Sequence, residues 1–214
     1  GSTTINAGTL ALRGTLGFTG GGVLTLSGGT LDMGVDGNFS SATHNSGTLA
    51  LGGKTLSLIT GNYALQSGSI TGGGVVALLG NSRNFNIGST TASIAADVTI
   101  RSEGINNAVF ITSPGGDYSL ASNLDGSSAS GAGSLSVLIN NLGFTTTLSG
   151  NNNYRLGTVV NSGAIAVGSD TALGTGTLFL QPNTALTSVG LRSIANPINL
   201  VAGSIAIRNT DTSN

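Results

Sequence analysis

The stretch FTTTLSGNNNYRLGTVVNSGAIAVGSDTALGTGTLFL, Phe144–Leu180, repeats short apolar segments that are separated by Gly, Asn and Ser. In segments such as AIAV and TLFL the apolar residues lie two positions apart, which is the period of a β-strand. The segments are too short for helices, and each Gly would cost a helix roughly 1 kcal/mol. This stretch therefore predicts short strands joined by glycine-rich corners.

One five-residue pattern, Gly-Thr-Leu-x-Leu or a close variant, recurs along the chain. It is present at 8–12, 22–26, 29–33, 47–51, 54–58, 74–78, 163–167, 176–180 and 203–207. In the copy at 47–51, Leu49 and Leu51 are expected to face one side of the strand and the residues before each of them the other. Paired copies follow one another after 25 and then 21 residues, a spacing that is typical of a solenoid or a propeller.

A parallel β-solenoid explains this repeat better than a propeller does. Propeller blades need about 40 residues and carry aromatic signatures, whereas aromatic residues are only 4% of this chain and Trp is absent. In a solenoid, coils of about 20 to 25 residues stack about 4.8 Å apart and bury their aliphatic residues against one another. We predict an all-β fold of about 9 or 10 coils, roughly 45 Å long, that forms a single segment over 1–214.

Composition excludes several classes of protein. Charged residues are 7% of the chain and the net charge is -1, while mean hydropathy is +0.28, so disorder of the whole chain is not expected. The absence of Cys excludes disulfides, thiol catalysis and cysteine zinc sites. No run of about 18 apolar residues and no signal-peptide pattern occurs, so we expect no membrane insertion of this segment.

The repeat weakens between about Asn81 and Asn141, although alternation survives in SIAADVTI at 93–100. Within this region, residues 125–134 (DGSSASGAGS) are predicted to form a flexible loop that projects from the rod. The chain begins in mid-pattern and its only Met is Met33. We therefore expect a piece of a longer chain, whose exposed strand edges tend to associate end to end.

The opening stretch resembles the passenger-associated transport repeat of bacterial autotransporters, which also contain an autotransporter-associated β-strand repeat. The positions that match its consensus are Leu148, Ser149, Gly150, Asn151, Asn152, Tyr154, Gly157, Thr158, Val160, Asn161, Gly163, Ile165, Val167 and Gly168. The segment TTINAGTLAL at 3–12 is similar to the second half of a preceding copy. Arg155 and Leu156 depart from the pattern, because small or hydroxyl residues are usual there. The clear match covers about a fifth of the chain.

This resemblance implies a right-handed parallel β-helix that is exported through a C-terminal barrel. The protein would then be secreted or lie on the exterior of a Gram-negative outer membrane. A stalk, an adhesin body or a fibre element is the expected function, and glycans or proteins of host or neighbouring cells are the expected partners. The repeat is a structural and secretion element, so the resemblance transfers no catalytic residue.

Few residues in the chain suggest chemistry. His44, the only histidine, stands in SSATHNSG with no carboxylate or nucleophile near it, and we predict a solvated turn residue. Asp32 and Asp36 are the closest pair of acids, and we predict that they are solvated acids at strand ends. The segment DMGVDGN loosely suggests a calcium loop but lacks the full series of ligands. We predict no catalytic, cofactor-binding or metal-binding residue.

Three alternatives remain beside this prediction. The first is a carbohydrate-active β-helix enzyme with a groove of dispersed acids, which such folds can support. The second is nucleic-acid or nucleotide binding, which we do not expect: the basic residues are scattered, and the GGGVL and GGGVV segments lack the Lys of a phosphate loop. The third is ice binding by outward Thr rows, which the irregular outward positions disfavour.

Overall fold

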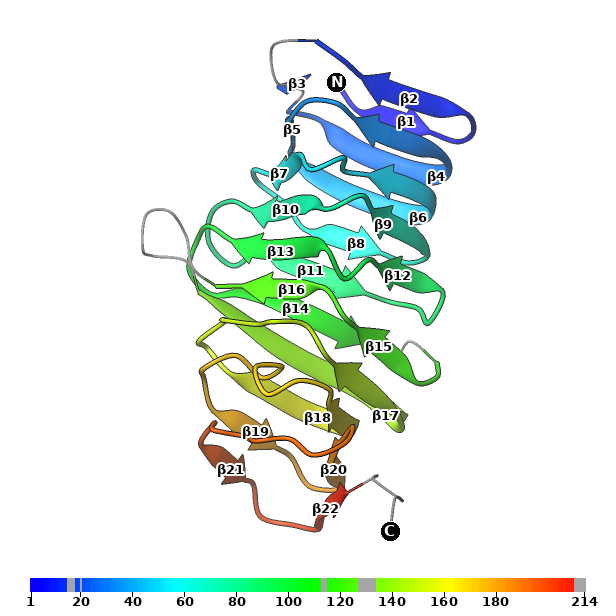
Figure 1. Cartoon of the computed structure of the whole chain (residues 1–214). Helices are drawn as coiled ribbons and strands as arrows, with labels where there is room; N and C mark the ends of the chain where they lie inside the picture. The colour runs from blue at the N-terminus through cyan, green and yellow to red at the C-terminus, as the bar shows by residue number, and fades with distance from the viewer. Residues whose placement is uncertain (15–17, 20, 113–114, 127–133, 210–214) are drawn as a thin grey trace.

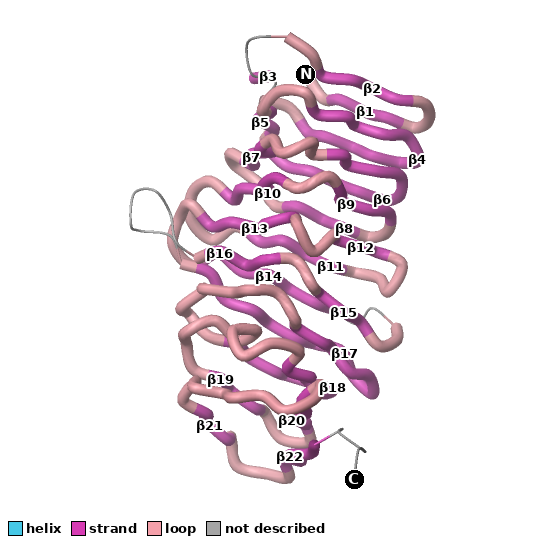
Figure 2. The backbone as a smooth tube through the Cα atoms, viewed as in Figure 1, coloured by secondary structure: helices cyan, strands magenta, loops and turns pink. Residues whose placement is uncertain are grey.

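The computed structural model describes residues 1–14, 18–19, 21–112, 115–126 and 134–209. These residues form a parallel β-solenoid of about nine turns, which confirms the predicted fold class (Figure 1). Strands and connecting loops make up the described part of the chain, and no helix occurs in it (Figure 2). That part consequently contains no helix that could span a membrane.

Each turn contributes up to three short strands, so the solenoid has three sides. The first side contains β1 (Thr3–Ile5), β4 (Val23–Met33), β6 (Ser41–Ala50), β8 (Tyr63–Leu65), β11 (Asn84–Ile87), β14 (Asn107–Thr112), β17 (Leu135–Leu148), β18 (Thr158–Val167), β19 (Leu178–Leu180) and β21 (Ile198–Leu200). The second side contains the later halves of β4, β6, β17 and β18 together with β2 (Thr9–Leu12), β9 (Gly68–Thr71), β12 (Ala92–Ile94), β15 (Tyr118–Leu120), β20 (Thr184–Ser188) and β22 (Ile205–Asn209). The third side is a six-stranded sheet of β3 (Phe18–Thr19), β5 (Gly37–Phe39), β7 (Thr55–Leu58), β10 (Gly74–Leu78), β13 (Val98–Ser102) and β16 (Asn123–Asp125).

Inward residues of the first side stack into a continuous column along the solenoid axis. Successive register partners in this column, which we call the Leu26–Leu180 column, are Leu26, His44, Leu65, Ile87, Ile111, Ile139, Val160 and Leu180. All of these side chains are buried. Each buried aliphatic residue contributes roughly 1.5–3 kcal/mol. It does so only because a turn lies above and below it, so neighbouring turns stabilise one another.

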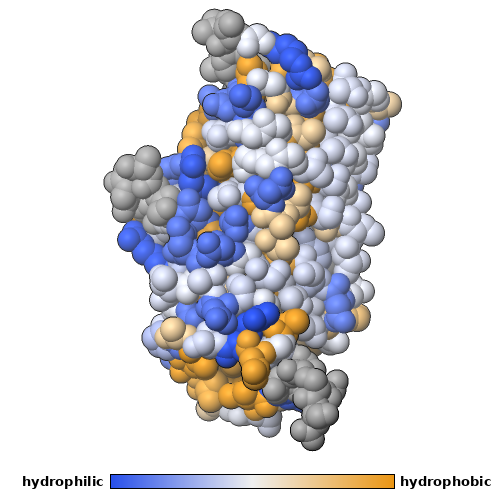
Figure 3. Space-filling view, in the orientation of Figure 1, coloured by the Kyte–Doolittle hydropathy of each residue, from blue (hydrophilic) through white to orange (hydrophobic). Residues whose placement is uncertain are grey.

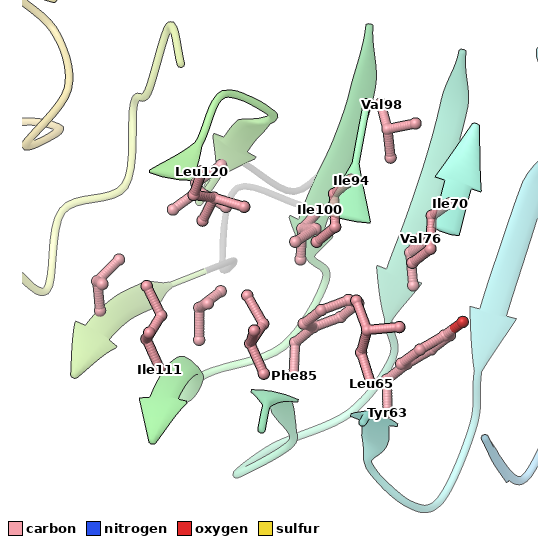
Figure 4. Packing of buried hydrophobic residues seen from close by; sticks show 14 of the residues in the cluster. Tyr63, Leu65, Ile70, Val76, Phe85, Ile94, Val98, Ile100, Ile111 and Leu120 are labelled. Atoms are coloured by element: carbon pink, nitrogen blue, oxygen red, sulfur yellow. The ribbon is translucent and has the colours of Figure 1, made fainter. Parts of the chain in front are cut away.

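The core is filled from all three sides. Leu65 and Ile111 point inward from the first side, Ile70 and Ile94 from the second, and Ile100 from the third (Figure 4). The copy of the repeat at 47–51 follows the prediction, because Leu49 and Leu51 are buried and the residues before them are only partly so. The period-two pattern therefore identified the core-facing positions correctly.

The corners between the sides depend on glycine at a few positions. Gly68 has φ of +88°, in the left-handed region that side chains rarely adopt. A Cβ atom on Gly68 would lie 2.5 Å from the Gly47 carbonyl oxygen and 2.6 Å from His44 Nε2. The close stacking of one corner on the next thus excludes any side chain at this position.

In the later turns, side chains replace the strands of the third side. Asn152 accepts a hydrogen bond from Leu124 N–H at 2.8 Å and donates one to the Ala172 carbonyl at 2.6 Å. The buried Tyr154 hydroxyl lies 2.6 Å from Thr158 Oγ1. Residues 151–155 form no strand, yet these contacts connect them to the turns on both sides. The Asn and Tyr positions of the resemblance therefore have structural roles.

The region of weak repeat remains part of the solenoid, but its turns are longer. The shortest turn separates Leu24 from Ala42, 18 residues apart, and the longest separates Val109 from Val137, 28 residues apart. Of the predicted loop at 125–134, Asp125 ends β16 and Ser134 is buried just before β17, while 127–133 lie outside the described residues. Extra residues in this part of the chain lengthen the turns without changing the strand register.

Candidate functional site

The closest pair of acids in the sequence has structural partners. Asp32 lies near the end of β4 and forms an ion pair with Arg13, which belongs to the preceding turn. Asp36 Oδ1 accepts a hydrogen bond of 2.8 Å from the backbone N–H of Thr55, in the following turn. The two carboxylates are therefore each engaged with a different turn, and they form no shared catalytic or calcium-binding arrangement.

Other acids accept hydrogen bonds from backbone N–H groups of a neighbouring turn, as Asp36 does. Asp117 Oδ1 accepts the Thr145 N–H at 2.7 Å, and Asp170 Oδ1 accepts the Ser193 N–H at 3.1 Å. Several Asn side chains do the same: Asn62 to Asn84 N–H, Asn81 to Ile105 N–H, and Asn123 to Asn151 N–H. Each contact joins one turn to the next, because a corner N–H that no strand pairs needs an acceptor. Among the described residues, no three His, Asp or Glu side chains are grouped so that they could hold a metal ion.

His44 is not a solvated turn residue, and that prediction is wrong. It lies within β6 and its side chain is fully buried in the Leu26–Leu180 column. Its Nδ1 is 2.9 Å from the Tyr63 hydroxyl and its Nε2 is 3.1 Å from the Gly47 carbonyl oxygen. An imidazole can replace an aliphatic residue in the column because both of its nitrogens have partners there.

These two contacts determine the tautomer of the neutral His44 ring. The Gly47 carbonyl can only accept, so Nε2 carries the proton, and the Tyr63 hydroxyl donates to Nδ1. Burial lowers the pKa of His44 below its ordinary value, although the hydrogen bond to Gly47 opposes this effect. Burial also raises the pKa of Tyr63. Both groups are neutral and shielded from solvent, so they suit a structural role better than a catalytic one.

A concave surface lies at a β-bulge in the later turns. Four residues of β17, Asn141–Phe144, face the single residue Gly163 of β18. We call these four residues the β17 bulge. Asn141 anchors it from inside through hydrogen bonds to the Gly116 carbonyl at 3.1 Å and Thr146 Oγ1 at 3.3 Å. Leu142 and Phe144 consequently project outward, with exposed fractions of 76% and 41%.

A groove of about 570 Å³ lies beside the β17 bulge, and we call it the bulge groove. Its floor is a column of small outward residues, in which the register partners are Thr145, Ala164, Ala185 and Ala206. Asn183 and Ser204 supply polar groups to the lining, and Arg208 supplies a charged one. No carboxylate is among the residues that line the groove.

The sequence prediction did not find the bulge groove. The only local signal is the extra length of INNLGFTT at 139–146 compared with its register partner VNSGAI at 160–165. A bulge of this kind bends its strand and redirects side chains, and it is common beside binding sites. The floor comes from three further turns, so the groove follows from stacking and cannot be found in one segment.

Comparison of the chain with protein-family models, curated proteins and solved structures found no match.

Proposed function

We propose that this chain is a structural and adhesive segment of a secreted or surface-exposed autotransporter passenger, where it serves as a stalk, an adhesin body or a fibre element. The observation that carries the proposal is the uninterrupted parallel solenoid, whose nine or so turns give a stiff elongated body. The consensus positions between Leu148 and Gly168 support the secretion route by resemblance. Asp36, Asp117 and Asp170, which were candidates for a catalytic groove, accept hydrogen bonds from backbone N–H groups of neighbouring turns.

Surface location is tested on intact cells of the bacterium that makes the protein. Antibodies raised against the purified chain are expected to label these cells, and external protease is expected to remove the label. The gene is expected to continue into a C-terminal β-barrel segment downstream of residue 214. Labelling that requires permeabilised cells, or a gene that encodes no barrel, would contradict the proposal.

The proposal also assigns no catalytic role to the chain. The carbohydrate-active alternative is tested by incubating the wild type with a panel of polysaccharides and measuring released reducing ends. We expect no product above background. Product formation that is lost in Asp32→Ala or Asp36→Ala, but retained in Asp97→Ala, would favour the enzyme instead.

The partners that fit this function are glycans or proteins on host or neighbouring cells, and further copies of the chain. Nucleic acid does not fit, because the seven basic residues are scattered along the sequence. Cells that display the chain on an unrelated anchor are expected to adhere to other cells or to one another more than cells that carry the anchor alone. Equal adhesion of cells with the displayed chain and cells with the anchor alone would favour a purely structural stalk over an adhesin.

A further inference from the structure

We propose that the bulge groove is a binding site for a linear anionic saccharide, such as a chain of uronic acid units. This inference rests on the proposed adhesive function for its biological role, but its physical basis is the groove alone. The groove combines an anchored apolar wall, a flat floor and a single cationic residue.

The wall of the groove is apolar and held in place. Phe144 and Leu142 project from the β17 bulge, whose base is fixed by the buried Asn141 side chain. Exposed aromatic rings are costly to leave in water, and they pack well against the apolar C–H face of a pyranose ring. Because the bulge is anchored, this wall does not have to be ordered when a ligand binds, which favours affinity.

The floor of the groove suits a ligand with a repeating unit. Thr145, Ala164, Ala185 and Ala206 follow one another from turn to turn, about 4.8 Å apart. Their small side chains leave an open channel along the solenoid axis. A hexopyranose unit is of similar length to this step, so consecutive sugar units can meet equivalent surroundings on consecutive turns.

The polar groups of the groove favour a saccharide over an extended peptide. Backbone N–H and C=O groups of β18 and β20 are used in pairing with the turns on both sides, and those of β22 pair with β20 on one edge. Except at the outer edge of β22, a peptide lying along the floor therefore gains few main-chain hydrogen bonds. Within the described part of the chain, the side chains of Asn183 and Ser204 make no hydrogen bond. Sugar hydroxyl groups can donate to and accept from both of them.

The charge of the groove favours an anionic ligand. Arg208 lines the groove and forms no ion pair with any described residue, and the lining residues include no acid. A guanidinium binds a carboxylate with two parallel hydrogen bonds, which is stronger and more specific than contact with a neutral hydroxyl. The carboxylate of a uronic acid unit is therefore the group that we expect at Arg208.

Calorimetry on the whole purified chain tests this site, with oligogalacturonate as the probe and a neutral cello-oligosaccharide of equal length for comparison. We expect saturable binding of the acidic oligomer and at least about tenfold weaker binding of the neutral one. Arg208→Gln and Phe144→Ala are each expected to weaken binding of the acidic oligomer by about tenfold. Arg192→Gln and Leu156→Ala are the matched controls outside the groove, and they are expected to bind as the wild type does.

Other outcomes would overturn the inference. Absence of saturable binding up to about 1 mM would do so, and so would equal losses in Arg208→Gln and Arg192→Gln. Equal binding of polyglutamate would show a general response to negative charge and would also overturn it. All variants alter exposed residues, and circular dichroism checks that each retains the wild-type fold. Failure here leaves the surface labelling result intact, so the two proposals are tested separately.

Discussion

The His44–Tyr63 pair is a polar contact inside an otherwise aliphatic column. Above and below His44 in the register lie Leu26 and Leu65, and all three side chains are buried. The Tyr63 ring stacks on Phe85, with ring centroids 4.7 Å apart, so the hydroxyl is held where it reaches His44 Nδ1. A buried pair of this type is stable only while both members keep their partners.

The protonation of His44 links stability to pH. Burial lowers its pKa from 6.5 in the folded chain, so the unfolded chain binds more protons once the pH falls below about 6.5. The free energy of unfolding is therefore expected to be at its full value above pH 6.5 and to decrease as the pH falls toward 5. Urea unfolding at several pH values measures this. Carboxylates titrate mainly below this window, so a slope that persists unchanged in His44→Leu would contradict the assignment.

Replacement of His44 by Leu tests the contact itself. The column accepts an aliphatic side chain, but the substitution leaves the Tyr63 hydroxyl without its His44 partner and removes one hydrogen bond from the Gly47 carbonyl. We expect a loss of about 1–3 kcal/mol in the free energy of unfolding. Adding Tyr63→Phe removes the stranded hydroxyl, so the double variant is expected to be more stable than His44→Leu. A double variant that is no more stable than the single one would show that the hydrogen bond contributes little.

Gly68 tests how closely one corner stacks on the next. Gly68→Ala places a Cβ against Gly47 and His44 and also requires a left-handed backbone. The matched control is Gly53→Ala, which has φ of +75° but open space around the Cβ. The control is expected to lose about 1–2 kcal/mol from backbone strain, and Gly68→Ala is expected to lose more. Equal losses in thermal unfolding would mean that the corner yields to the added methyl group.

At the scale of the strands, the sequence predicts most of what the structure contains. Strands were predictable because inward aliphatic residues alternate, as in 47–51. The strand through His44 was not predicted, because SSATHNSG has the composition of a turn. Its inward residues are Ala42 and His44, and the partner that makes His44 acceptable is 19 residues away, in the next turn. The segment 151–155 has no alternating apolar residues in the sequence. Its burial nevertheless alternates, because the buried Asn152 and Tyr154 are held by side-chain hydrogen bonds where no strand forms.

Corner carboxylates provide the corresponding test for contacts between turns. Asp117→Ala removes the acceptor of the Thr145 N–H, and Thr145 directly follows the β17 bulge. We expect a loss of about 0.5–1.5 kcal/mol in the free energy of unfolding. Asp117→Asn retains an acceptor and is expected to lose less. Asp97→Ala is the control, because Asp97 is exposed and makes no such contact among the described residues. A loss in Asp97→Ala equal to that in Asp117→Ala would indicate a general charge effect.

At the scale of the whole solenoid, strand pairing stops at the first and the last turns of the described residues. β1 pairs only with β4 and β21 only with β19 within the described chain, so one edge of each has no partner strand. The apolar residues of the last turns are exposed where their counterparts in earlier turns are buried, and hydrophobic side chains gather at this end of the surface (Figure 3). Leu200, 52% exposed, continues the Leu26–Leu180 column, and Ile207, 65% exposed, follows Leu186 on the second side.

These two ends are complementary, so we predict that the chain associates head to tail as its concentration rises. The first turn leaves Leu10 38% exposed and the last turn leaves Leu200 and Ile207 exposed, and an added turn would pair the open strand edges and cover these side chains. Light scattering over a range of concentrations is expected to show growing mass. Leu200→Lys is expected to suppress this growth, because a charge would be buried at the junction. Leu156→Lys, at an exposed position away from both ends, serves as the control. A constant monomer mass in the wild type would contradict the prediction. Growth in mass that Leu156→Lys stops and Leu200→Lys does not stop would also contradict it, because the rods would then associate along their sides.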